Sequence, residues 1–110
     1  MIDVLFRFKK GYIVAYELEG HAGFDDIGND ILCSAVSFLS QTTLNGLSEV
    51  LKVDVQYEFD DDGYLSVSIE NEEDEHINKC QVLLQTMLLG IKSLIKDGYE
   101  DYIRLFVKEV

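Results

Sequence analysis

Apolar residues recur along this chain with two different periods, and the order of those periods is the strongest constraint on its fold. In five segments they occupy alternate positions, which is the spacing of a β-strand with one buried face. In two longer segments they recur every three or four positions, which is the spacing of an amphipathic helix. The segments follow one another as strand, strand, helix, strand, strand, helix, strand.

The expected strands form two hairpins and one closing strand. The first hairpin turns at Lys10-Gly11, and the second turns at the acidic, glycine-containing segment 60–63. Short links of this kind between alternating segments are typical of β-hairpins. The five expected strands cover residues 2–8, 12–19, 53–59, 65–69 and 102–110.

The two expected helices cover residues 31–50 and 77–96. Asn29 or Asp30 is expected to cap the first helix, because short polar side chains are favoured just before a helix begins. The acidic segment 71–75 suits the start of the second helix, since negative charge is stabilised at the positive end of the helix dipole. Gly98 is placed to end that helix.

These elements predict a single α+β domain over residues 1–110. We expect a two-layer sandwich in which a mainly antiparallel sheet carries two helices on one face, in the order ββαββαβ, because this arrangement buries every apolar stripe. Hydrophobic residues make up 47% of the 110-residue chain and charged residues 27%. A chain of this length and balance buries enough surface in one core to fold without a metal or a disulfide.

The composition limits the partners and the location of the protein. A formal net charge of −12 argues against direct nucleic-acid binding, because phosphate backbones are bound by clustered Lys and Arg. The N-terminal segment lacks the regions of a secretory signal, and no uncharged apolar stretch approaches the ~20 residues of a membrane span. Two cysteines without a C-x-x-C pair favour neither a disulfide nor a zinc site. We therefore expect a cytoplasmic protein with reduced thiols, without a cofactor or metal, that binds neither membranes nor nucleic acid.

His21 and Cys33 flank a glycine-rich loop and are the candidate catalytic pair. Residues 20–30 contain three glycines and no usable period, so this loop can fold back and bring the imidazole to the thiol. A thiol with an ordinary pKa of ~8.5 is only a few per cent ionised at neutral pH, and a neighbouring imidazolium and a helix start both favour the thiolate. Catalysis by a cysteine nucleophile needs such a base, which later protonates the leaving amine.

A purely structural role competes with catalysis for both cysteines, because cysteine is among the most frequently buried residues. Cys80 lies on the apolar stripe of the second helix, and we expect it in the core. Cys33 lies off the stripe of the first helix, in line with Ser37 and Ser40, so we do not expect it to point into the core. Asp30 is a candidate to orient His21, although helix capping is the commoner role for an aspartate at such a position.

The segment Gly20-His21-Ala22-Gly23, followed by Gly28-Asn29-Asp30-Ile31-Leu32-Cys33-Ser34-Ala35-Val36-Ser37, resembles the signature G-H-A … G-x-D-I-V-C-A-A-V-S. This signature belongs to the ribosomal-processing cysteine proteases of bacteria. The resemblance covers essentially the whole chain, since that family shows the same order of hairpins and helices. Leu32 and Ser34 replace the usual Val and Ala, which are small changes on the helix.

The resemblance implies that Cys33 is the nucleophile and His21 its base. The implied substrate is the N-terminal extension of large-subunit ribosomal protein number twenty-seven, a precursor cut after a pair of phenylalanines. The resemblance also implies a homodimer and a mobile lid formed by residues 23–28.

The helix start is expected to bind the developing oxyanion through backbone N–H groups, including that of Cys33. Further candidates for the oxyanion site or the substrate loop are Gly20, Gly23, Phe24, Gly28 and Ser37. The alternative function is a non-enzymatic dimeric module for ribosome assembly or binding, in which the fold is kept and the thiol is inert.

Overall fold

The computed structural model of the chain describes residues 1–20 and 27–110. Two β-hairpins, two long helices and a closing strand follow one another in the order ββαββαβ, and each long helix ends in a short π-helical segment, η1 or η2. The elements are β1 (Ile2–Lys9), β2 (Tyr12–Glu19), α1 (Ile27–Asn45), η1 (Gly46–Val50), β3 (Gln56–Phe59), β4 (Leu65–Ser68), α2 (Asp74–Leu94), η2 (Ile95–Tyr99) and β5 (Ile103–Glu109).

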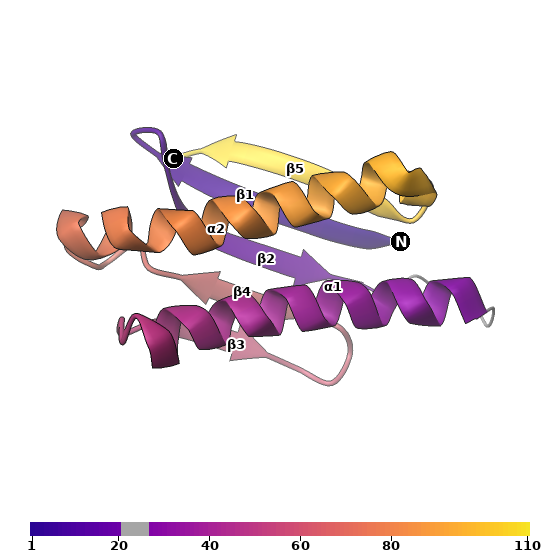
Figure 1. Cartoon of the computed structure of the whole chain (residues 1–110), viewed down its shortest axis with the longest axis horizontal. Helices are drawn as coiled ribbons and strands as arrows, with labels where there is room; N and C mark the ends of the chain where they lie inside the picture. The colour runs from indigo at the N-terminus through magenta and orange to yellow at the C-terminus, as the bar shows by residue number, and fades with distance from the viewer. Residues whose placement is uncertain (21–26) are drawn as a thin grey trace.

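The strands form one mixed sheet with the order β3-β4-β2-β1-β5. Three of its pairings are antiparallel, and the fourth, between β1 and β5, is parallel. Both helices lie on the same face of this sheet (Figure 1). The expected α+β sandwich, with a mainly antiparallel sheet and two helices on one face, is therefore confirmed.

The first hairpin turns where it was expected. Lys10 and Gly11 both have positive φ, +52° and +84°, which is the geometry of a two-residue hairpin turn that matches the twist of the strands. The register of β1 and β2 shifts between Arg7 and Phe8, as in a β-bulge. Close to this shift, the backbone N–H and C=O of Ile13 both bond to the side-chain amide of Gln81, each at 2.9 Å. A side chain of α2 thus satisfies two buried backbone groups of β2.

The core lies between the sheet and the helix layer. Phe6 and Tyr16 from the central strands and Leu84 and Met87 from α2 are almost completely buried there. The expected stripe of the second helix is buried from Ile77 to Ile91, whereas Val50 at the end of the first expected stripe is exposed. Val50 belongs to η1, where the wider π-helical turn moves its side chain off the stripe.

The two helical segments of the helix layer pack closely against each other at two glycines. A Cβ atom on Gly46 would lie 2.8 Å from Leu83 Cδ1, and one on Gly90 would lie 2.8 Å from Leu39 Cδ2. Each glycine therefore leaves the space that a leucine of the other helix fills, and this contact fixes α1 against α2. No helix within the described residues is long and apolar enough to cross a membrane.

The start of the first helix differs from the expectation. α1 begins at Ile27, so Asn29 and Asp30 lie inside its first turn and the predicted cap at either residue is wrong. Gly28 and Asn29 have low helix propensity and read as part of a loop, but tertiary context routinely overrides such preferences. The second helix begins at Asp74, close to the expected acidic start, and Gly98 near its end has φ +114°.

Candidate active site

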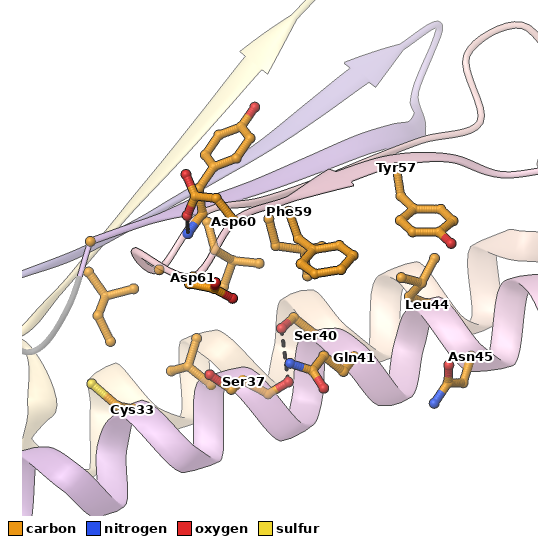
Figure 2. A pocket seen from close by; sticks show the side chains of 17 residues that line it. Cys33, Ser37, Ser40, Gln41, Leu44, Asn45, Tyr57, Phe59, Asp60 and Asp61 are labelled. Atoms are coloured by element: carbon orange, nitrogen blue, oxygen red, sulfur yellow. Dashed lines mark hydrogen bonds between the residues drawn. The ribbon is translucent and has the colours of Figure 1, made fainter.

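A groove with a volume of about 470 Å³ runs between α1 and the β3–β4 hairpin (Figure 2). One wall is the face of α1 that turns toward the hairpin, and the other wall is the hairpin itself. Ile2, Leu18 and Gly20, at the adjoining ends of β1 and β2, also line the groove. The groove is the candidate active site because it contains the expected nucleophile.

The α1 wall carries a line of small and polar side chains at four-residue spacing. Cys33, Ser37, Gln41 and Asn45 all line the groove, and residues four apart on a helix lie on the same face. Figure 2 shows the sulfur of Cys33 at one end of this line. Cys33 therefore lies outside the core interior and lines the groove with Ser37, as expected, although its side chain also packs against the core. Ser40, the other residue expected on this line, is almost completely buried.

The two cysteines occupy different environments. Cys33 is half-buried and lines the groove, whereas Cys80 is completely buried between the helix layer and the sheet. Burial raises the pKa of the Cys80 thiol, and Glu72 also raises it, while Lys79 opposes the shift. Cys80 is thus a core residue, as expected, and its thiol resists ionisation.

The hairpin wall contributes two aromatic side chains that the sequence did not mark as functional. Tyr57 and Phe59 line the groove and are 54% and 68% exposed. Their rings are stacked with centroids 6.5 Å apart and planes within 9° of parallel. Their alternation along the strand predicted that they lie on a buried face. This face instead borders a groove because of where α1 lies, which the alternation does not indicate.

The turn that follows β3 brings carboxylates to the same groove. Asp60 Oδ1 accepts hydrogen bonds from the backbone N–H groups of Asp62, at 2.8 Å, and Tyr64, at 3.1 Å. These bonds hold the turn, so one oxygen of Asp60 has a structural role. Asp60 and Asp61 both line the groove, and no lysine or arginine lines it within residues 1–20 and 27–110.

Gly20 ends β2 at the groove and directly precedes His21 in the chain. Its N–H donates to the Gly63 carbonyl at 3.1 Å, and its φ is +102°. A Cβ atom at this position would collide with the carbonyl oxygen of Met1. Only glycine fits here, and its N–H is engaged by Gly63, so it is not available to an oxyanion.

Several expected site residues cannot be compared with this geometry. His21, Gly23 and Phe24 lie outside the described residues. Gly28 and Asp30 belong to α1, but only their backbone assignment is described, and the Asp30 side chain is not. Apart from the helix cap at Asp30, the expected roles of these five residues remain predictions.

Because α1 begins earlier than expected, the backbone groups at its start are also different from the expected oxyanion donors. Only the first four N–H groups of a helix lack an intrahelical acceptor, and Cys33 is the seventh residue of α1. Its N–H is therefore not one of these groups, and the expectation that Cys33 belongs to the helix start is wrong. Ser37, one turn further along, is exposed and lines the groove.

A buried hydrogen bond ties α1 to the strand that leads to His21. The Tyr16 hydroxyl on β2 donates to the Ser40 carbonyl on α1 at 2.8 Å. Burial raises the pKa of Tyr16 above its ordinary value of 10.0, so the hydroxyl stays protonated and keeps donating into the alkaline range. This bond helps to fix the spacing between the helix that carries Cys33 and the strand that ends at Gly20.

Known proteins are similar to this chain in sequence and in fold. The family model of the cysteine protease Prp matches residues 1–104. A ribosomal processing cysteine protease Prp from Staphylococcus aureus is 33% identical over 103 residues, covering 90% of this chain and 91% of that protein. The crystal structure of a protein from Streptococcus mutans gives a TM-score of 0.84 at 31% identity, covering 100% of this chain and 96% of the other.

A crystal structure of an essential ribosomal processing protease Prp from S. aureus, in complex with a covalently linked product peptide, is similar as well. It gives a TM-score of 0.81 at 27% identity and covers 98% of this chain and 100% of that one. The family model and these relatives confirm the resemblance stated from the sequence, and they decide against the non-enzymatic alternative. The chain belongs to the Prp family of cysteine proteases.

Proposed function

We propose that this protease removes the N-terminal extension of large-subunit ribosomal protein number twenty-seven, with Cys33 as nucleophile and His21 as base. The observation that carries the proposal is the position of Cys33 at the end of a groove that Gly20, the residue before His21, also lines. The name of the S. aureus relative, a ribosomal processing cysteine protease, supports the class of substrate. The covalently linked product peptide in the related structure supports catalysis through a covalent intermediate.

In the proposed reaction the Cys33 thiolate attacks the carbonyl carbon of the scissile peptide bond. The C–N bond then breaks as His21 gives its proton to the leaving amine, and a thioester joins Cys33 to the N-terminal fragment. Water attacks this thioester while His21 takes its proton, which releases the fragment as a carboxylic acid and regenerates the Cys33 thiolate beside protonated His21. The Ser37 hydroxyl, one turn from Cys33 on the same wall, is the proposed donor to the developing oxyanion.

The charge of the protein supports a basic substrate. The chain has a net charge of −12, and the described residues that line the groove include two aspartates but no lysine or arginine. Complementary charge speeds the encounter of two proteins and disfavours partners of like charge. We therefore propose that the enzyme meets a basic ribosomal-protein precursor away from RNA, in the reducing cytoplasm, where the Cys33 thiol stays reduced.

We also propose that the enzyme is a homodimer, as the resemblance implies. The outward face of α2 exposes large apolar side chains, including Val82 and Leu89, which supports contact with a second copy. Size-exclusion chromatography with light scattering is expected to give twice the 12.5 kDa chain mass. A monomer at micromolar concentration would contradict this part of the proposal.

Cleavage of the extended ribosomal protein tests the proposed function. The precursor from the same organism is incubated with wild type, Cys33→Ala, His21→Ala and the control Ser34→Ala, and the products are identified by mass spectrometry. Ser34 is exposed beside Cys33 but does not line the groove, so its variant should cut like wild type. Cleavage by Cys33→Ala refutes the nucleophile, and an intact precursor with active wild type refutes the substrate.

A further inference from the structure

The groove contains an apolar surface that the core of the protein leaves uncovered. Tyr57 and Phe59 lie opposite Val67 and Leu65 of β4 in the sheet register. Val67 is 1% exposed, whereas Tyr57, its direct partner, is 54% exposed. The core therefore ends at β4, and the two aromatic rings of β3 project over α1 without a covering residue from the described chain (Figure 2).

The spacing of these rings matches the repeat of an extended peptide. Side chains two residues apart in an extended chain lie on the same side, about 6.6 Å from each other. The ring centroids of Tyr57 and Phe59 are 6.5 Å apart and the rings are nearly parallel. Two alternate side chains of an extended peptide can thus each contact one ring.

The opposite wall offers partners for the backbone of such a peptide. Gln41 and Asn45 are exposed, line the groove and carry amides with both donor and acceptor atoms. An extended backbone presents N–H and C=O groups along its length. When the peptide enters a groove, these groups lose their hydrogen bonds with water, so the protein must provide replacement partners. The line from Cys33 through Ser37 to these two amides therefore suits a peptide that lies along α1.

The position of each ring along α1 gives the distance from the cut. Figure 2 places Phe59 over Ser40 and Gln41, and Tyr57 over Leu44. With a helical rise of ~1.5 Å per residue, these points lie ~11 Å and ~16 Å along the helix from Cys33. An extended peptide with ~3.3 Å per residue covers these lengths in about three and about five residues.

We infer that the enzyme selects substrates with apolar side chains at two positions two residues apart, on one side of the scissile bond and about three and five residues from it. Phe59 contacts the side chain nearer the cut, and Tyr57 contacts the farther one. The residue between them points away from both rings and carries no apolar requirement. This inference rests on the proposed position of the cleaved bond at Cys33.

A peptide library measures this selectivity without the ribosomal substrate. Wild type, Phe59→Ala, Tyr57→Ala and the control Phe38→Ala are incubated with a synthetic mixture of random peptides, and the cleaved products are sequenced by mass spectrometry. Phe38 is an exposed phenylalanine of α1, 73% exposed, that does not line the groove. Its removal therefore deletes the same side chain without changing the aromatic pair.

Wild type and Phe38→Ala are expected to share a preference for apolar residues at two positions separated by one residue. Phe59→Ala should reduce the preference at the nearer position roughly tenfold, and Tyr57→Ala should do the same at the farther position, since one apolar contact discriminates by about this factor. Unchanged preferences in both variants, or wild-type cleavage with no apolar preference at two alternate positions, overturn the inference. Cleavage of the library by Cys33→Ala would instead overturn the nucleophile proposed above.

Discussion

The Gly20→Ala substitution perturbs the joint between β2 and the segment that begins with His21. Alanine at φ +102° is strained by ~1–3 kcal/mol. Its Cβ atom must also displace the Met1 carbonyl, and overpacking of this kind costs ~1–3 kcal/mol more. The backbone here has little freedom to yield, because the adjacent Ile2 N–H is bonded to the Tyr102 carbonyl at 2.8 Å. The expected loss of unfolding free energy is therefore ~2–6 kcal/mol.

Substitution of a second glycine separates the cost of backbone strain from the cost of overpacking. Gly98 has a similar φ of +114°, but a Cβ atom there meets nothing within 4 Å, so Gly98→Ala should lose only the ~1–3 kcal/mol of backbone strain. With ~2.1 cal/mol/K of unfolding entropy per residue, 1 kcal/mol corresponds to ~4 °C in a chain of 110 residues. Calorimetry should show a Tm lower by ~10–25 °C for Gly20→Ala and by ~4–13 °C for Gly98→Ala.

The activity of the same two variants tests the link to catalysis. A displacement of ~1 Å in a catalytic group can lower a rate ~100-fold, so kcat/KM for Gly20→Ala should fall far more than its unfolded fraction explains. Gly98→Ala, measured below its Tm, should keep the kcat/KM of wild type. If the two variants match in both Tm and kcat/KM, the close approach of Gly20 to Met1 has no role in placing the site.

Three further predictions follow from buried groups and from the two thiols. Gln81→Leu leaves the N–H and C=O of Ile13 without their partners, and at ~1–3 kcal/mol for each group, urea unfolding should show a loss of ~2–6 kcal/mol; a loss below 1 kcal/mol would mean that water replaces the amide. Burial raises the pKa of Tyr16 above its ordinary value of 10.0, so the folded state holds this proton more tightly and stability should fall as the pH rises above 10. Tyr16→Phe should weaken this alkaline decline by up to ~1.4 kcal/mol per pH unit, and an identical pH profile in both proteins would contradict the assignment. Iodoacetamide at neutral pH should alkylate Cys33, which lines the groove, well before Cys80, whose pKa burial raises; peptide mapping that finds equal rates would contradict the difference in exposure.

The spacing of apolar residues along the sequence predicted most of the fold, because the residues at these positions are the ones whose side chains are buried. Phe6 and Cys80 lie in the core as their positions in the stripes indicated. The parallel pairing of β5 with β1 did not follow from these patterns. It joins segments about a hundred residues apart, and nothing in the local period of either strand specifies its neighbour.

The candidate site was predictable only in part. The position of Cys33 off the apolar stripe correctly indicated that it lies outside the core interior, but it did not indicate the groove that Cys33 lines. Tyr57 and Phe59 follow the same alternation as core residues, so their role depends on where α1 lies over the sheet, which is a property of the assembled fold. The start of α1 at Ile27, earlier than expected, was also not predictable from the sequence, because the residues after Ile27 have low helix propensity.

The acyl-enzyme provides the most direct test of Cys33 as the nucleophile. A p-nitrophenyl ester of the N-terminal product peptide acylates a nucleophilic cysteine quickly, so the thioester should accumulate and release a burst of p-nitrophenol. The proposed mechanism predicts a burst of about one equivalent per active site, with the acyl group mapped to Cys33 after acid quenching, and no burst from Cys33→Ala. A burst of the same size from Cys33→Ala, or an acyl group on another residue, would contradict it.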